Sequence, residues 1–460
     1  MRKHFVWVWC LVMAAPLSLL VPLQAQDAQK TPSYSGLSRF AQSRVFNAAK
    51  PDFWSREFRA FAGDAAEATA MRWTEQAQLL GSDSSSYHFF GNSVAISGNT
   101  AVVGAPGYED FNGHSVMGAA YVFVKSGTDW QSMVQTAKLL PADGSNCSTC
   151  YFAYSVAISG NTIAVGSDSG EVHLYQSGSG TWTDATEIAT ISNGMGGTDF
   201  FGNQIALTGN TLVVGAPESG QSQGTAYVFV QPASGWVSTS QPNAVLTASD
   251  GQADDLFAAS VTIAGNSVLV GAPTKPYPQQ YGALYVFVRP STGWKSMTET
   301  AKLTAKTPSL GALLGWSLTS FGNAAIAGAP TGTDFPGPGA AYVFVRPAGG
   351  WKNASENAIL SDGTHTVDSF GVSVSLSGNT LLVGASSTAF GGNQFQGAAY
   401  SFRQPTSGWM TTSKYSAKLR EQFGEAEDAF GHSVNLDHNT AIIGAYERGM
   451  GTGTSFIFVQ

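Results

Sequence analysis

Short apolar runs alternate with small polar residues along most of the chain, and the same arrangement returns seven times. In the copy that begins at Phe201, Ile205 and Leu207 alternate with small or polar residues. A Gly-Asn pair follows at 209–210, and a second apolar run covers 212–214. Alternation with a period of two indicates a half-buried strand, and Gly-Asn suits the positive φ angles of a two-residue turn. The pattern predicts a tight β-hairpin at the start of each copy.

Each copy continues with two further apolar segments. After a loop of variable length comes a segment of the type Tyr-Val-Phe-Val, as at 121–124 and 285–288. A Gly-rich turn then leads to a tryptophan and to a short run such as Ala301–Leu303. Every repeat therefore contains four predicted antiparallel strands. Seven four-stranded sheets arranged radially form a β-propeller, so we predict an all-β, seven-bladed propeller over residues 73–460.

The two ends of the repeat region predict how the ring closes. The seventh copy stops at Gln460, after its third strand, and Ala77–Leu80 matches the fourth strands of other copies, such as Ala137–Leu140. We therefore expect this N-terminal strand to complete the last blade. Trp73 lies only four residues before Ala77 and is out of register with the six tryptophans of the other copies. A full copy of the motif is not expected there.

A fixed signature marks all seven copies, in which a Phe-Gly-like pair is followed by a Gly-Ala-Pro-like triplet at an offset of 14 residues. The pairs begin at Phe90, Phe152, Phe201, Phe257, Leu314, Phe370 and Phe430, and the triplets begin at Gly104, Gly166, Gly215, Gly271, Gly328, Gly384 and Gly444. Together with the Gly-x-x-Tyr-Val-Phe-Val segment, this signature resembles the FG-GAP repeats of the integrin α-subunit N-terminal propeller and of many exported bacterial proteins. The resemblance implies a seven-bladed propeller that works outside the cytoplasm, commonly in cell adhesion or ligand binding.

The predicted hairpin turns depart from the integrin pattern. Integrin-type repeats often carry an Asp-rich calcium loop between the first two strands, whereas this chain has Ser-Gly-Asn-Thr at 97–100 and close equivalents in the other copies. Calcium takes six to eight oxygen ligands, largely from carboxylates. We therefore transfer no calcium site from the family to these turns, and we expect no cofactor, with calcium as the open alternative.

The segment before the repeats begins with a pattern typical of export. Basic residues precede an apolar stretch at 5–23, and a small residue follows at Ala25. We predict a signal peptide over residues 1–25 and an N-terminal extension of unassigned role over residues 26–72. The alternative is an uncleaved membrane anchor, but two prolines interrupt a stretch that is already short for a span. The expected location is secreted or periplasmic.

The charge balance argues against nucleic acid as a partner. The chain has 31 Asp and Glu against 23 Lys and Arg, a formal net charge of −8. Cleavage of the signal peptide would remove two basic residues and make the chain more acidic. Nucleic acid binds to a basic surface, so we expect no nucleic-acid partner. No second apolar segment predicts a transmembrane span.

Signal cleavage would leave Cys147 and Cys150 as a pair in an oxidising setting, and we predict a disulfide between them. Their spacing also occurs in metal sites. Zinc would need two more ligands, however, and no second Cys pair or paired histidines follow.

The predicted blades have two different faces. Antiparallel strands place the turns between strands one and two on one face, the hairpin face. The loops between strands two and three and between blades lie on the other, the loop face. Loop lengths vary only on the loop face, where binding residues concentrate in rigid scaffolds. The predicted ligand-binding residues are Tyr108, Glu109, Asp110, Phe111, His114, Tyr277, Tyr281, Phe335, Tyr446, Glu447 and Arg448. The alternative is that these side chains only cap the blades.

An aspartate stands two residues before the Phe of the signature in four copies. These are Asp199, Asp255, Asp368 and Asp428, whereas the other copies have His88, Cys150 and Ala312. One hypothesis is a ring of carboxylates that holds a cation or a basic ligand. The other, which we favour, is that each aspartate accepts backbone hydrogen bonds in its own turn. The weak candidates for a metal site are Asp254, Asp255, Glu425, Glu427 and Asp428.

No motif of a known catalytic site is present. The chain lacks Gly-x-Ser-x-Gly, His-Glu-x-x-His and phosphate-loop patterns, and its seven histidines are scattered. We therefore predict no catalytic residues and an exported, non-enzymatic propeller that binds an extracellular or periplasmic protein or glycan through its loop face. Two alternatives stay open: a glycan-active hydrolase or lyase with carboxylates from several blades, and a metal-stabilised adhesin.

Overall fold

The computed structural model describes residues 72–107, 118–142, 151–167, 169–177, 182, 187–331, 338–364 and 366–460. They belong to one compact unit, Thr69–Gln460. The predicted signal peptide and nearly all of the N-terminal extension lie outside the described residues. So do the predicted site residues Tyr108, Glu109, Asp110, Phe111, His114 and Phe335, and the predicted disulfide of Cys147 with Cys150.

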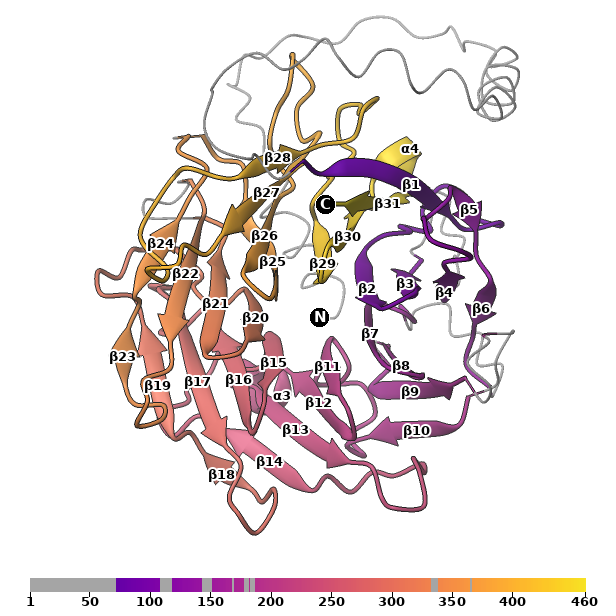
Figure 1. Ribbon diagram of the computed structural model, residues 1–460. Helices are drawn as coiled ribbons and strands as arrows, with labels where there is room; N and C mark the ends of the chain where they lie inside the picture. The colour runs from indigo at the N-terminus through magenta and orange to yellow at the C-terminus, as the bar shows by residue number, and fades with distance from the viewer. Residues whose placement is uncertain are drawn as a thin grey trace, which may run out of the picture. The chain divides into compact units, whose positions relative to one another are not determined.

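Within the described residues, seven sheets built on four antiparallel strands form the blades of a β-propeller, as predicted (Figure 1). Blades 1 to 3 contain β2 (Ser93–Ser97), β3 (Thr100–Ala105), β4 (Ala119–Val124) and β6 (Ala137–Leu139); β7 (Ser155–Ser159), β8 (Thr162–Gly166), β9 (Glu171–Gln176) and β10 (Ala189–Ser192); and β11 (Gln204–Thr208), β12 (Thr211–Ala216), β13 (Thr225–Val230) and β14 (Ala244–Thr247). Blades 4 and 5 contain β15 (Ser260–Ala264), β16 (Ser267–Ala272), β17 (Ala283–Val288) and β19 (Ala301–Thr304); and β20 (Ser317–Phe321), β21 (Ala324–Ala329), β22 (Ala340–Val345) and β24 (Ala358–Leu360). Blades 6 and 7 contain β25 (Phe370–Ser377), β26 (Thr380–Ala385), β27 (Ala398–Arg403) and β28 (Ala417–Leu419); and β29 (Ser433–Asp437), β30 (Thr440–Ala445), β31 (Thr454–Val459) and β1 (Thr74–Leu80).

The N-terminal strand closes the ring. β1 pairs antiparallel with β31, with Thr74 opposite Val459 and Leu79 opposite Ser455. Figure 1 shows the indigo β1 beside the yellow β31. Trp73, just before the strand, packs against the cluster of buried side chains in blade 7. The first described strand is therefore the fourth strand of the last blade, as the sequence predicts.

The Phe-Gly and Gly-Ala-Pro parts of the signature meet at the joint between neighbouring blades. The carbonyl of Gly315 at the start of blade 5 lies over Gly271 of blade 4, where an added Cβ would come within 2.2 Å of that oxygen. Ser260 of blade 4 donates its hydroxyl to the same carbonyl at 2.6 Å. Equivalent serine bonds to the next blade come from Ser155, Ser317, Ser373 and Ser433. The fixed offset thus keeps the Gly of one blade against the residue after the Phe of the next blade, which is Gly at five joints and Ala at the two joints that involve Ala153 and Ala258.

The Phe of the signature fills the apolar space next to this joint. Phe257 is 1% exposed, and its ring lies 5.4 Å from that of Tyr285 and 6.0 Å from that of Phe287, edge to face in both cases. Such aromatic pairs add about 0.5–1.5 kcal/mol beyond the area they bury. The buried clusters each combine residues of two adjacent blades, so the core lies between blades rather than within them.

An outer clasp joins consecutive blades along the rim, and the sequence pattern does not predict it. Three two-residue strands, β5 (Met133–Val134), β18 (Met297–Thr298) and β23 (Ala354–Ser355), pair in parallel with the outermost strand of the preceding blade. A hydroxyl or amide two residues after a tryptophan accepts a backbone N–H from that strand. These acceptors are Ser132, Ser238, Ser296, Asn353 and Thr411. This recurring position is the sequence signal for the clasp.

Helices are confined to two short segments among the described residues. α3 (Ser219–Ser222) and α4 (Arg448–Gly451) occupy equivalent loops between strands two and three of blades 3 and 7. No helix in the described ranges has the length and apolar character that crossing a membrane requires.

Candidate functional site

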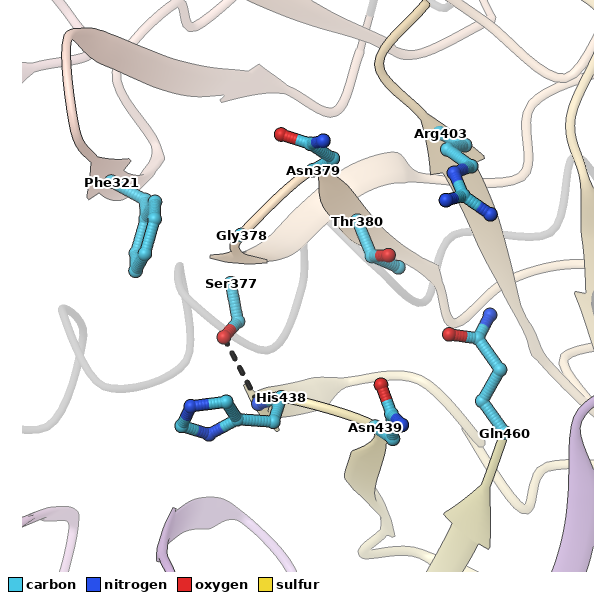
Figure 2. Close-up of a pocket in the computed structure, with 9 residues that line it drawn as sticks. All are labelled: Phe321, Ser377, Gly378, Asn379, Thr380, Arg403, His438, Asn439 and Gln460. Atoms are coloured by element: carbon cyan, nitrogen blue, oxygen red, sulfur yellow. Dashed lines mark hydrogen bonds between the residues drawn. The ribbon is translucent and has the colours of Figure 1, made fainter.

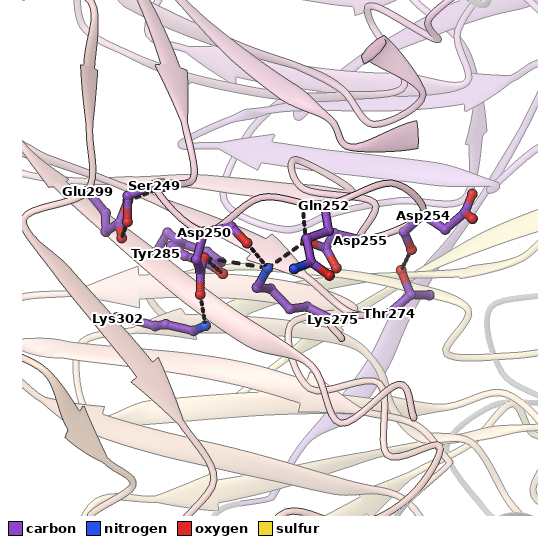
Figure 3. A network of polar contacts seen from close by, with 10 residues as sticks. All are labelled: Ser249, Asp250, Gln252, Asp254, Asp255, Thr274, Lys275, Tyr285, Glu299 and Lys302. Atoms are coloured by element: carbon purple, nitrogen blue, oxygen red, sulfur yellow. Dashed lines mark hydrogen bonds and ion pairs between the residues drawn. The ribbon is translucent and has the colours of Figure 1, made fainter. Parts of the chain in front are cut away.

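The loop after β16 carries Lys275, whose charge is buried at the loop face of blade 4 (Figure 3). Only 6% of its surface is exposed. Its ammonium group lies 2.6 Å from a carboxylate oxygen of Asp255 and 2.5 Å from the backbone carbonyl of Asp250. An unpaired buried charge is strongly destabilising. Lys275 therefore ties its own loop to the connection that leads into blade 4.

Asp250 also accepts bonds from two strands of blade 4. The hydroxyl of Tyr285 donates to it at 2.7 Å, and the ammonium of Lys302 donates at 2.5 Å. Burial acts to raise the pKa of Asp250, but the hydrogen bonds from Lys302 and Tyr285 outweigh it and lower that pKa. The equivalent residues in blade 1 are Asp83, Tyr121 and Lys138. This Tyr-Asp-Lys unit is a repeated structural element.

Blade 6 has two carboxyl groups close together at the position of this Tyr-Asp-Lys unit. Asp368 is 2% exposed, and one of its oxygens accepts the backbone N–H of Phe370 at 3.1 Å. The hydroxyl of Tyr400 donates to Asp362 at 3.2 Å. Burial and the neighbouring charge of Asp362 raise the pKa of Asp368 to about 8. Asp368 is therefore mostly protonated at neutral pH, and no lysine forms an ion pair with this pair of carboxyl groups in the described structure.

Blade 7 combines a carboxyl pair with an arginine. Glu421 is 2% exposed and lies 2.9 Å from the guanidinium of Arg448 in α4. Burial and a hydrogen bond with Asp428 raise the pKa of Glu421 to about 9, although Arg448 acts in the opposite direction. Asp428 also accepts the backbone N–H of Glu425 at 2.5 Å. Arg448, a predicted ligand-binding residue, thus contacts an internal carboxyl group.

The two residues before Arg448 lie at the joint between blades 7 and 1. The ring of Tyr446 lies 4.2 Å from that of His432 and 5.7 Å from that of Phe89. Desolvation lowers the pKa of His432 to about 4 and raises the pKa of Glu447. Both Tyr446 and Glu447 are half-buried.

The described members of the predicted ligand-binding set do not form one pocket. Tyr277 is 55% exposed and Tyr281 is half-buried, both in the loop of blade 4 that carries Lys275. Blades 5 and 6 separate this loop from Tyr446, Glu447 and Arg448. The set therefore occupies two places on the loop face, and its assignment to ligand binding stays a prediction.

The four aspartates that precede the signature are buried. They accept backbone N–H groups of their own connections, such as that of Phe201 to Asp199 at 3.3 Å and that of Gln252 to Asp255 at 2.7 Å. Asp254, Glu425 and Glu427 are exposed. No group of three or more His, Cys, Asp or Glu side chains placed to hold a metal occurs in the described ranges. The metal candidates stay predictions.

The loop face also presents a set of exposed apolar side chains, which we call the apolar rim. They lie in the loops of blades 4, 6 and 7 and in four of the connections between blades, and they are 40% to 77% exposed. The members are Met195, Tyr277, Leu310, Val367, Phe395, Phe423 and Met450. Of these, only Tyr277 belongs to the predicted ligand-binding set. The sequence signal for the apolar rim is a large apolar residue inside a Gly- and Asp-rich loop.

A comparison with protein families finds repeated matches along the propeller. The model of the FG-GAP repeat matches residues 73–123, 133–180, 182–229, 242–287, 355–402 and 415–458, together more than half of the chain. The chain belongs to the FG-GAP repeat family. No match covers residues 288–354 of this FG-GAP protein, which include the first three strands of blade 5, whose signature begins with Leu314 in place of Phe.

Other comparisons add little. No curated protein matches the chain. Among solved structures, the crystal structure of the computationally designed Ika8 protein covers 84% of this chain and 99% of its own, with 15% identity and a TM-score of 0.43. A likeness at that level carries no argument about function.

Proposed function

We propose that this FG-GAP protein is exported and acts as a non-enzymatic recognition propeller, which binds a protein or glycan partner through its loop face. The apolar rim supports this proposal most directly. Exposed Met, Leu, Val and Phe side chains on one face are typical of a surface that another protein covers. Aliphatic side chains give a glycan few hydrogen bonds, so the rim favours a protein partner.

Rigid support for the loops is a second argument. The buried contacts of Lys275 and Arg448 fix the loops of blades 4 and 7 to the neighbouring connections. A loop held in place loses less conformational entropy when a partner binds. The two loops that carry Tyr277 and Met450 of the rim are therefore held by these contacts.

The alternative of a glycan-active hydrolase or lyase has weaker support. Raised carboxyl pKa values are typical of a general acid. The carboxyl groups that show them, Asp368 and Glu421, are each only 2% exposed; Asp368 accepts the N–H of Phe370 in its own turn, and Glu421 contacts Arg448. A substrate would have to displace those contacts to reach them. A metal-stabilised adhesin is the other alternative, and a fall in thermal stability on adding a chelator would support it.

The test uses the full chain, immobilised, and the extracellular and surface proteins of the cells that make it. Proteins that are retained would be identified, purified and titrated by calorimetry. We expect the double variant Phe423→Ser/Met450→Ser to bind such a partner at least about tenfold more weakly. The matched control is Val237→Ser/Met410→Ser, which removes two apolar residues that are 50% and 54% exposed beside the outer clasp and do not belong to the rim.

Equal loss in both double variants, or no loss in either, would contradict the proposal. So would turnover of a polysaccharide by the wild-type protein, because this result would favour the enzymatic alternative.

A further inference from the structure

The hairpin face departs from its own repeat in blades 5, 6 and 7. Five copies have Ser, Thr or Ala before the first turn residue, whereas blade 5 has Phe321, which is 51% exposed. Five copies end their third strand with Val, whereas blade 6 ends it with the exposed Arg403. Six copies have Gly as the first turn residue, whereas blade 7 has His438, with 89% of its side chain exposed. All three departures replace a small or apolar residue by a larger side chain that faces solvent.

These three side chains line one pocket of about 430 Å³ (Figure 2). Phe321 and His438 lie on either side of the turn at Ser377 and Gly378, and Arg403 lies on the other side of the pocket. Three carboxamides complete its wall, those of Asn379, Asn439 and Gln460. Residues far apart in the sequence, and each unusual within the repeat, therefore converge on a single place.

The histidine is held in position by its neighbours. Ser377 accepts the backbone N–H of His438 at 3.0 Å, and Nδ1 of the imidazole lies 2.6 Å from a carboxylate oxygen of Asp437. The other oxygen of Asp437 accepts the N–H of Gly98 in blade 1 at 2.6 Å. Both carboxylate oxygens of Asp437 thus have partners. The Nε2 side of the exposed imidazole is available to a ligand.

His438 occupies a backbone conformation that the other copies give to glycine. Its φ is 53°, close to the 56° to 62° of the six turn glycines. The left-handed region costs a residue with a Cβ roughly 1–2 kcal/mol. Blade 7 is the one copy of the seven that places a residue with a Cβ at this turn position.

Two further groups in the pocket lack protein partners. Arg403 forms no ion pair with any described residue. The side-chain nitrogen of Gln460 is buried and has no hydrogen-bond partner among the described residues. A buried donor without a partner costs about 1–3 kcal/mol, and a ligand that accepts its hydrogen bond recovers this loss.

We propose that this pocket binds a saccharide that carries a carboxylate, such as a uronic acid unit. The exposed ring of Phe321 suits the apolar face of a pyranose, and the guanidinium of Arg403 suits a carboxylate, which it can bind with two parallel hydrogen bonds. Each carboxamide offers both donors and an acceptor, which matches hydroxyl groups that also donate and accept. The site lies on the opposite face from the apolar rim and is independent of it.

The same residues fit a phosphate group less well. A fully ionised phosphate only accepts hydrogen bonds, so the three carboxamide oxygens of the pocket would be left without donors. It would also bring two negative charges to a single arginine in an acidic protein. A carboxylated sugar brings one negative charge and several hydroxyl donors.

Calorimetric titration of the full chain with oligogalacturonate, oligoguluronate and oligoglucuronate tests the proposal. We expect at least one of them to bind, and its neutral methyl ester to bind at least about tenfold more weakly. Phe321→Ser and Arg403→Val, which restore the residues found in other copies, should each weaken binding by about tenfold or more. Val237→Ser, at a residue that is 50% exposed and belongs neither to the pocket nor to the apolar rim, is the matched control and should leave saccharide binding unchanged.

Thermal unfolding of each variant establishes that it is folded, and Asn379→Ala provides a further pocket variant if one of the two is not. Failure of all three acidic oligosaccharides to bind would overturn the proposal. Equal binding of the methyl ester would overturn it as well, as would binding of inorganic phosphate alone or binding that is unchanged in both Phe321→Ser and Arg403→Val.

Discussion

The two faces of this propeller are stabilised in different ways. On the hairpin face, short turns repeat with nearly the same residues, and a small side chain of one blade accepts an N–H from the next, as Ser159 does from Gly209 at 2.9 Å. On the loop face, connections differ from blade to blade, and each relies on its own buried polar contacts. Lys275 links two aspartates in blade 4, whereas in blade 6 burial and the neighbouring charge of Asp362 raise the pKa of Asp368.

This difference teaches where to look for function. A position that recurs in all or most copies meets a structural need of the joints, as do the glycine that begins each triplet and the serine that bonds to the next blade. A position that departs from the repeat and faces solvent meets no such need. The apolar rim on one face and Phe321, Arg403 and His438 on the other are departures of this kind.

The largest effect should come from removing the buried cation of the loop face. Lys275→Met leaves Asp255, which is 1% exposed, without its charged partner, so we expect a loss of about 3–5 kcal/mol in the free energy of unfolding. Lys302→Met is the matched control, because the pair of Lys302 with Asp250 is more exposed, and should lose less than about 1 kcal/mol. Urea unfolding measures both, and equal losses would show that burial of the charge does not decide the outcome.

The carboxyl pair of blade 6 should make the free energy of unfolding decrease as pH rises. Burial raises the pKa of Asp368 from 3.8 to about 8, so between these values the unfolded chain releases the proton and the folded chain keeps it. This group therefore contributes less stability as pH rises through that range. Between pH 5 and pH 9 the free energy of unfolding should fall for the wild type. The fall should be smaller by at least about 1.4 kcal/mol for Asp368→Asn, whose side chain cannot ionise.

Urea midpoints at the two pH values check this prediction. If the wild type and the Asn variant respond to pH alike, Asp368 is not the protonated member of the pair. Asp362→Asn would then identify whether its partner carries the proton.

The smallest effect on stability should come from the hairpin face. His438→Gly relieves a left-handed backbone and should stabilise the fold by about 1 kcal/mol or less. Asn439→Gly is the control, since Asn439 is not in that backbone region and gains nothing from glycine. We expect His438→Gly, but not Asn439→Gly, to raise the melting temperature. If His438→Gly also binds the acidic saccharide more weakly, His438 destabilises the fold and contributes to binding.

Much of the fold could be predicted because the sequence signature of the joint between blades recurs in every copy. The offset of 14 residues in the signature, the hairpin turns and the match of Ala77–Leu80 to a fourth strand follow from local pattern alone, and the structure confirms the blades and the ring closure. The outer clasp could not be predicted in this way because its strands are only two residues long, and their pairing partner lies in the preceding blade.

The candidate sites could be predicted less well, because they depend on distances between blades. Nothing in the sequence indicates that Arg448 contacts Glu421, or that Lys275 is buried between two aspartates. The hairpin pocket does not follow from the repeat pattern either, because that pattern describes the hairpin turns as uniform. The signal for it is nevertheless present in the sequence, since aligning equivalent positions of the seven copies singles out Phe321 and Arg403 as departures.

We infer that recurring positions stabilise the propeller and that exposed departures bind partners. The most direct test measures stability and binding on one variant, Phe423→Ser/Met450→Ser, with the protein partner retained by the wild type. We predict a free energy of unfolding within about 1 kcal/mol of the wild type and partner binding at least about tenfold weaker. A variant that loses several kcal/mol of stability while its affinity for the partner is unchanged would contradict the account.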